Sequence, residues 1–227
     1  MMHGRMAAPK QVCRKRIAAV LAVLLLALQL AGCSATELEN RCFPMLAVAD
    51  YRVGLVEFCF GFPVLSQKSE TDVEESKVQA AMAQGGDFAS AVSNYDKQLD
   101  KKADCNHLKV LLIGQEMMEE SGACADMFRA LRESEQFPRN IYVCVTRDVA
   151  ELLETEGTLP TDMGSYLQTY LQNHEKEHGG KLVTLGSILD ERENHSKVLH
   201  LPYLTVEDGS ILWDAEWDLD MRQQFFE

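Results

Sequence analysis

The stretch His174-Glu175-Lys176-Glu177-His178 has the residue types and the spacing of a zinc site. It matches H-E-x-x-H, in which two histidines one helical turn apart bind zinc and the glutamate acts as a general base. It equally matches the inverted form H-x-x-E-H. A zinc hydrolase that uses His174 and His178 is therefore one function that the chain could perform.

The surroundings of this motif argue against a metal site. Lys176 and Glu177 are charged, whereas a motif packed in a protein core is usually apolar at these variable positions. Gly179 and Gly180 follow directly and favour the end of the helix. Cationic histidines are favourable at a solvated helix C-terminus, which is the simpler interpretation. We therefore expect no metal, no cofactor and no catalytic residue, and the sequence contains no G-x-S-x-G, phosphate loop or G-x-G-x-x-G motif.

A second candidate for chemistry is Cys33, which follows Leu30, Ala31 and Gly32. This small-residue site ending in cysteine resembles a bacterial lipobox. In that chemistry the thiol receives a diacylglyceryl group, and cleavage then leaves the cysteine as the new N-terminus. The sequence thus predicts a covalent lipid on Cys33 and attachment to a bilayer, which a second acyl chain would make stable.

The residues before the lipobox have the pattern of a secretory signal. Residues 17–30 form an apolar run of 14 residues, which is shorter than the roughly 20 that span a bilayer and suits the core of a signal peptide. All charged residues in 1–32 are basic. We expect a lipoprotein signal peptide at 1–32, with an uncleaved membrane anchor as the alternative.

The charge balance excludes one class of partner. The chain has 22 basic and 35 acidic residues, and five of the basic ones lie before Cys33, so residues 33–227 carry a net charge of −18. Nucleic acid would repel such a chain through its phosphates, and so would an anionic bilayer surface. We therefore expect no nucleic-acid partner, and tethering by lipid rather than by charge.

The chain has seven cysteines. Cys13 is removed with the signal peptide and Cys33 is the predicted lipid site, so five others remain, which is an odd number. At least one of these five stays unpaired in a monomer, and none belongs to a C-x-x-C pair of the kind found in zinc ribbons. Cys59 and Cys144 stand among apolar residues, which indicates buried thiols rather than disulfides.

The apolar patterning predicts a mixed α/β fold, with a central mixed sheet flanked by helices and a C-terminal β-hairpin. The run at 110–113 has no polar alternation and indicates a strand buried on both faces. Asp87 and Asp148 are expected to cap helices, and residues 163–171 carry an amphipathic stripe that is a core face. Strands are expected at 43–49, 54–65, 107–114, 141–145, 199–206 and 211–219.

The last two expected strands form a hairpin around Asp208-Gly209. Strict alternation in the return strand predicts one apolar face, which should pack on the helices of the domain; its members are Ile211, Trp213, Ala215, Trp217 and Leu219. Residues 66–86 are polar and are expected to be a flexible excursion. The expected division is a signal peptide at 1–32, a tether at 33–42 and one α/β domain at 43–227.

Four stretches, which follow the lipobox in order, resemble the N-terminal domain of the Ger(x)C family of spore germination lipoproteins. They are residues 37–50, 107–116, 138–145 and 201–209. The sequence departs from the family where Ser34-Ala35 replaces the Trp-Asp pair common after the lipid cysteine. It also departs in ending at Glu227, where family members usually continue into a C-terminal region of comparable length.

The resemblance implies a non-enzymatic C subunit of a nutrient germinant receptor. Such a subunit is anchored by lipid on the outer face of the spore inner membrane. It works beside two polytopic membrane subunits, A and B, one of which resembles an amino-acid transporter. Two alternatives stay open: a substrate-binding lipoprotein of a transporter, which needs a cleft between two lobes, and a lipid-anchored zinc hydrolase.

Overall fold

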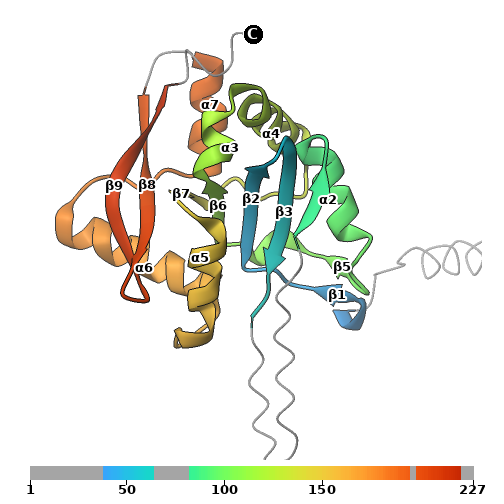
Figure 1. Ribbon diagram of the computed structural model, residues 1–227, viewed down its shortest axis with the longest axis horizontal. Helices are drawn as coiled ribbons and strands as arrows, with labels where there is room; N and C mark the ends of the chain where they lie inside the picture. Colours follow the sequence, from blue (N-terminus) through green and yellow to red (C-terminus); the bar gives the residue numbers. More distant parts are fainter. Residues whose placement is uncertain (1–37, 64–81, 195–197, 221–227) are drawn as a thin grey trace, which may run out of the picture. The chain divides into compact units, whose positions relative to one another are not determined.

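A seven-stranded mixed sheet is the centre of the fold in the computed structural model, which describes residues 38–63, 82–194 and 198–220 (Figure 1). Its strands are β2 (Leu46–Arg52), β3 (Leu55–Gly61), β4 (Ala83–Gly85), β6 (Val110–Gly114), β7 (Tyr142–Thr146), β8 (Val198–Glu207) and β9 (Ser210–Asp220). They lie in the order β4-β3-β2-β6-β7-β8-β9. A separate two-stranded parallel pair joins β1 (Arg41–Cys42) to β5 (Lys102–Ala103).

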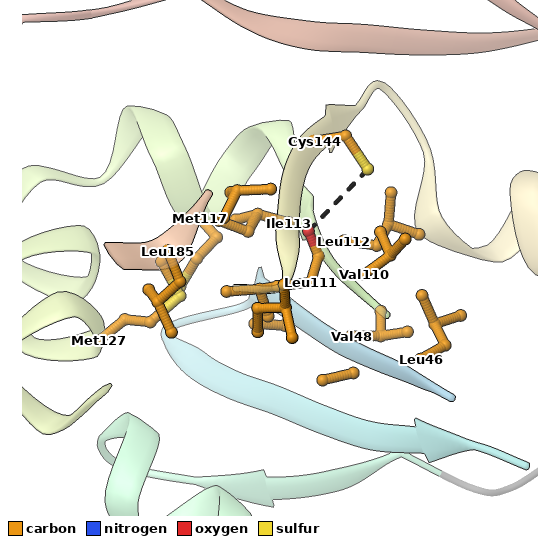
Figure 2. Packing of buried hydrophobic residues seen from close by; sticks show 14 of the residues in the cluster. Leu46, Val48, Val110, Leu111, Leu112, Ile113, Met117, Met127, Cys144 and Leu185 are labelled. Carbon is orange, nitrogen blue, oxygen red and sulfur yellow. Dashed lines mark hydrogen bonds between the residues drawn. The ribbon is translucent and has the colours of Figure 1, made fainter. Parts of the chain in front are cut away.

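Four adjoining strands, β2, β6, β7 and β8, run parallel, and β3 and β9 flank them in the antiparallel sense. Every residue of β6 is buried, as its continuous apolar sequence predicts. Figure 2 shows the packing around this strand, where the thiol of Cys144 in β7 lies 3.9 Å from the carbonyl oxygen of Leu111. The predicted mixed sheet with flanking helices and a C-terminal hairpin is confirmed.

The helices cover both faces of this sheet. They are α2 (Phe88–Asp96), α3 (Gln115–Glu119), α4 (Ser121–Glu133), α5 (Val149–Glu154), α6 (Met163–His178) and α7 (Leu185–Asn194). Phe58 of β3 packs edge to face against Phe88 and Tyr95, so α2 lies on this face of the sheet. Helix α4 contacts α2 and lies on the same face. Tyr142 lies on the opposite face, where Gln172 of α6 donates a hydrogen bond to its hydroxyl at 3.2 Å.

Short polar side chains start the helices as their sequence predicts. Asp87 forms a capping box with Ser90 at the start of α2. Asp148 accepts from the backbone N–H groups of Ala150 and Glu151 at the start of α5. These caps satisfy N–H groups that a helix leaves without internal partners. The predicted caps at Asp87 and Asp148 are confirmed.

The C-terminal hairpin forms as predicted, but its apolar residues do not share one face. A β-bulge shifts the register, so that Leu204 pairs with Trp213 whereas the adjacent Tyr203 pairs with Ala215. One extra residue reverses the alternation of side chains. Trp213 and Trp217 therefore point to opposite faces, both are only half-buried, and Ala215 is exposed. The expectation of one covered face is wrong for this reason.

Two further expectations have mixed outcomes. Residues 83–85 of the polar stretch 66–86 form β4, whose strand character the sequence did not reveal, and residues 64–81 lie outside the described part of the chain. The thiols of Cys59 and Cys144 are buried, as expected, and burial raises the pKa of Cys59 to about 12. A thiol of this kind is inert, because the thiolate is the reactive form.

The first turn of α6 lies so close to the start of β2 that only glycine fits. A Cβ at Gly164 would lie 2.4 Å from the carbonyl oxygen of Met45, which is backbone and cannot move aside cheaply. We predict that Gly164→Ala lowers the free energy of unfolding by about 1–3 kcal/mol through overpacking. Gly157→Ala is the control, because nothing lies within 4 Å of that position. Denaturant titration of both variants measures the difference, and equal stabilities would contradict the packing described.

Candidate functional site

The predicted lipid site lies outside the described residues. Leu30, Ala31, Gly32 and Cys33 all precede residue 38, so the lipid on Cys33 stays a prediction. Among the described residues, no helix has the length and apolar character needed to cross a membrane.

The H-E-K-E-H stretch forms the last turn of α6, which ends at Gly179 with a φ of +77° as the two glycines predict. The rings of His174 and His178 stack with their centroids 4.2 Å apart, so their faces, rather than their nitrogen atoms, meet. Glu175 accepts a hydrogen bond from the N–H of Leu182 at 3.0 Å. Nothing in this arrangement directs the three side chains at a common point, as zinc ligation and general-base catalysis require.

His174 packs against the sheet instead of standing in water. Its ring stacks on Trp213 of β9 at a centroid distance of 4.2 Å, and its Nδ1 is buried without a hydrogen-bond partner. Burial and then the neighbouring His178 lower its pKa. The expectation of a solvated pair is thus wrong for His174, which is half-buried, and fits His178, which is exposed.

Two further histidines among the described residues, His200 and His107, lie away from this motif. His200 lies in β8 and is exposed, with its Nδ1 2.7 Å from Asp218. His107 lies outside the strands and is exposed, with its ring edge to face on Phe43 at 5.2 Å. Both rings have partners, although neither belongs to a buried strand face.

A cluster of charged groups lies at the carboxyl end of the parallel strands. Asp50 of β2 is 3% exposed, and its carboxylate accepts hydrogen bonds from the N–H of Tyr51 and from Nε of Arg52, each at 2.9 Å. Arg52 also reaches Asp148, the N-cap of α5, at 3.3 Å. The guanidinium therefore links the end of β2 to the element that follows β7, across the end of β6. We call Asp50, Arg52 and Asp148 the carboxyl-edge network.

Gly114 makes room for this network. It is the last residue of β6, and a Cβ there would lie 1.9 Å from Oδ1 of Asp50. The Asp50 carboxylate thus occupies the space where any other residue at position 114 would place its side chain. Since Asp50 is held by two hydrogen bonds, it has little freedom to move aside.

Burial dominates the electrostatics of Asp50. It raises the pKa of this carboxyl above the ordinary value of 3.8, and the nearby Glu116 raises it further, whereas the N–H of Tyr51 and the guanidinium of Arg52 act in the opposite sense. A buried carboxylate needs paired hydrogen-bond donors to remain charged. Arg52 and Tyr51 provide them, so the Asp50 carboxylate is paired within the network.

A second set of polar contacts lies beside this network, on the other face of the sheet. The hydroxyl of Tyr203 in β8 donates to Oε1 of Gln115 at the start of α3, and Gln115 donates to Glu119 at 2.6 Å. Tyr203 also stacks on Trp217 of β9 with a centroid distance of 6.0 Å. The hydrogen bond from Tyr203 thus connects the β8–β9 hairpin to Gln115, the residue that directly follows β6.

The stretches singled out in the sequence come together in this region. They contain β2, β6, β7 and β8, which are the four adjacent parallel strands. Their ends supply Asp50, Gly114, Gln115 and Tyr203. Sequence reasoning missed the network itself. Its one available signal was a charged or glycine residue directly after an apolar strand, at the edge where open α/β sheets place their sites.

Comparison with known proteins identifies one family. The family described as spore germination protein, N-terminal domain, matches residues 34–206. No curated protein and no solved structure matches the chain.

The close approach of Asp50 to Gly114 predicts that the destabilisation caused by a side chain at position 114 is relieved when the Asp50 carboxylate is removed. Gly114→Ala should lower the free energy of unfolding by roughly 2–4 kcal/mol, because the new methyl group displaces a buried, hydrogen-bonded carboxylate. In the Asp50→Ala background the same change should cost clearly less, since the obstructing oxygen is gone. Denaturant titration of the four proteins gives the coupling energy. Additive losses would show that the two residues do not compete for this space.

The two histidines of α6 should behave differently. His174→Ala should lower the free energy of unfolding by about 1 kcal/mol through loss of the ring stack on Trp213, whereas His178→Ala should change it little. Because the pKa of His174 is lowered on folding, its neutral ring favours the folded state above the ordinary pKa of 6.5, and this contribution falls as the pH drops below that value. The loss in His174→Ala should therefore be smaller at pH 5 than at pH 7.

Metal analysis of the same purified proteins completes this test. We expect substoichiometric zinc in the unmodified chain and no change in either variant. Stoichiometric zinc that disappears in His174→Ala and in His178→Ala would restore the hydrolase hypothesis.

Proposed function

The chain belongs to the family of spore germination proteins that share this N-terminal domain, and from its role in germination we propose that it is a lipid-anchored, non-enzymatic subunit of a nutrient germinant receptor. The proposed partners are the polytopic A and B membrane subunits of the receptor and the bilayer that holds the lipid of Cys33. The proposed location is the outer face of the spore inner membrane. The proposal includes no cofactor apart from the diacylglyceryl group.

One observation carries the lipid anchor. The family match begins at Ser34, directly after the cysteine of the lipobox. A domain that starts where lipoprotein processing would cut is the arrangement expected of a domain held at a membrane by its first residue. The basic cluster and the 14-residue apolar run before it support the same interpretation.

The short connection would hold the domain close to its partners. Five residues, 34–38, separate Cys33 from Glu39, and an extended chain spans at most about 3.6 Å per residue. Glu39 would then lie within about 20 Å of the acylated cysteine. Confinement to one membrane raises the effective concentration of weak contacts, so that the domain needs no large intrinsic affinity for the membrane subunits.

The carboxyl-edge network supports a non-enzymatic role. This edge of an open α/β sheet is where ligands and catalytic groups are usually found. Here Asp50 and Asp148 both bind Arg52, and Gly114 leaves room only for the Asp50 carboxylate. Charged groups that satisfy one another in this way stabilise a scaffold, and surface loops remain available for partners.

The anchor is tested by removing its thiol. Cys33→Ala should abolish incorporation of labelled palmitate and leave the chain unprocessed or released from the membrane fraction. Cys42→Ala is the matched control, because Cys42 is the one half-exposed thiol among the described cysteines and follows the predicted site by nine residues. If Cys33→Ala retains labelling and membrane association, the lipoprotein hypothesis is wrong.

Receptor function is tested in spores that lack this chain. Restoring the unmodified chain should restore germination by a nutrient, whereas Cys33→Ala should not, and the A and B subunits should co-purify only with the unmodified chain. A transporter-binding lipoprotein would instead change nutrient uptake in growing cells and leave germination unchanged. Normal germination in the absence of the chain would exclude the receptor role.

A further inference from the structure

The turn between β2 and β3 places a valine where the backbone disfavours one. Val53 has a φ of +52° and Gly54 a φ of +82°, and Arg52 pairs directly with Leu55 across the two-residue turn. Positive φ at both central positions is the geometry of a type I′ turn, for which asparagine, aspartate and glycine are the favoured residues. A β-branched residue at positive φ is a genuine outlier.

The other hairpin of the same sheet has the same turn with a favourable residue. Asp208 has a φ of +52° and Gly209 a φ of +73°, between the paired residues Glu207 and Ser210. The backbone of this protein thus adopts one turn geometry twice. Only the β2–β3 turn carries a side chain that opposes it.

The Val53 side chain buries no apolar surface against the rest of the domain. It is fully exposed, with a relative exposure of 101%, and the nearby Leu55 is 37% exposed. Among the described residues, the large exposed apolar side chains are these two and Leu212. We call Val53 and Leu55 the hairpin knob. A valine at positive φ that buries no surface is unfavourable for the isolated chain, and backbone outliers of this kind cluster at functional sites.

The base of the knob is rigid and acidic. Arg52 is held by Asp50 and by Asp148, which fixes the end of β2 from which the turn projects. Three carboxylates act on this guanidinium, those of Asp50, Asp148 and Glu57, and Glu116 acts on Asp50. Asp50 is buried, so the accessible carboxylates at this base are those of Asp148, bound to Arg52 at 3.3 Å, and Glu57, two residues from Leu55 in β3, and they outnumber the one guanidinium. We call these two carboxylates the acidic rim.

We propose that the hairpin knob is a protein-docking element that enters an apolar pocket with a basic rim on a partner protein. The apolar tip supplies the contact area, and the acidic rim selects Lys or Arg around the pocket. Because the network already holds the hairpin in place, binding loses little conformational freedom. An anionic bilayer and a second copy of this acidic chain are both disfavoured by the same rim. The proposal does not depend on the receptor role.

The test compares two properties of one variant, its thermal stability and its binding to the partner, which should change in opposite directions. The first part measures the stability. Val53→Asn introduces the residue that the turn prefers, and it should raise the Tm of the full chain in detergent by about 2–4 °C. The control is Asp208→Asn in the other turn, which should leave the Tm nearly unchanged. A Tm that falls in Val53→Asn would show that the valine serves the fold, and would overturn the proposal.

The second part identifies the occupant. A benzophenone side chain placed at Leu55 in the full, membrane-attached chain should form one protein adduct, and the adduct should decrease at least tenfold in the Val53→Asn background and weaken as salt is raised. The matched control is the same probe at Leu212, which is equally exposed at 38% and should not give this adduct. The crosslinked peptide of the partner should contain apolar residues flanked by Lys or Arg.

Each other result overturns the proposal. An adduct with phospholipid would assign the knob to the bilayer, and an adduct with another copy of the chain would assign it to self-association. The proposal also fails if the adduct is absent, if it is unchanged by Val53→Asn, or if its partner peptide has neither apolar nor basic residues.

Discussion

The burial of β6 on both faces is the constraint on which the other features depend. A strand with no exposed residue needs helices on each side, and the chain supplies them by sending α2 and α4 to one face and α6 to the other. In many open α/β sheets, ligands bind at the carboxyl ends of the parallel strands.

In this protein the chain's own side chains occupy the carboxyl ends of these strands. Asp50 lies in β2, Gly114 leaves space for its carboxylate, and Arg52 crosses to Asp148 at the start of α5. A buried carboxylate is unfavourable unless it is paired, and removing one partner of such a pair destabilises strongly. The network thus ties three separate strands together at the position where an enzyme of this architecture would have its site.

The sequence predicted what depends on neighbouring residues and missed what depends on distant ones. The apolar run of β6, the caps at Asp87 and Asp148 and the stop at Gly179 are all local signals, and each is found. The bulge in β9 depends on pairing with β8 and is invisible in an alternating pattern. The stack of His174 on Trp213 joins residues 39 positions apart, and Arg52 meets Asp148 across 96 positions. No periodicity within one segment could have revealed these contacts.

The charge of the chain and its proposed anchor together bear on which end of the domain meets partners. If Cys33 carries lipid, the chain enters the domain through β1, directly before the amino end of β2. The hairpin knob lies at the other end of that seven-residue strand, about 20 Å further on. A net charge of −18 in residues 33–227 opposes close approach of the domain to an anionic surface. Under the proposed anchor, the amino end of β2 would therefore be the end held nearest to the bilayer, and the hairpin knob at the carboxyl edge would be the end farther from it.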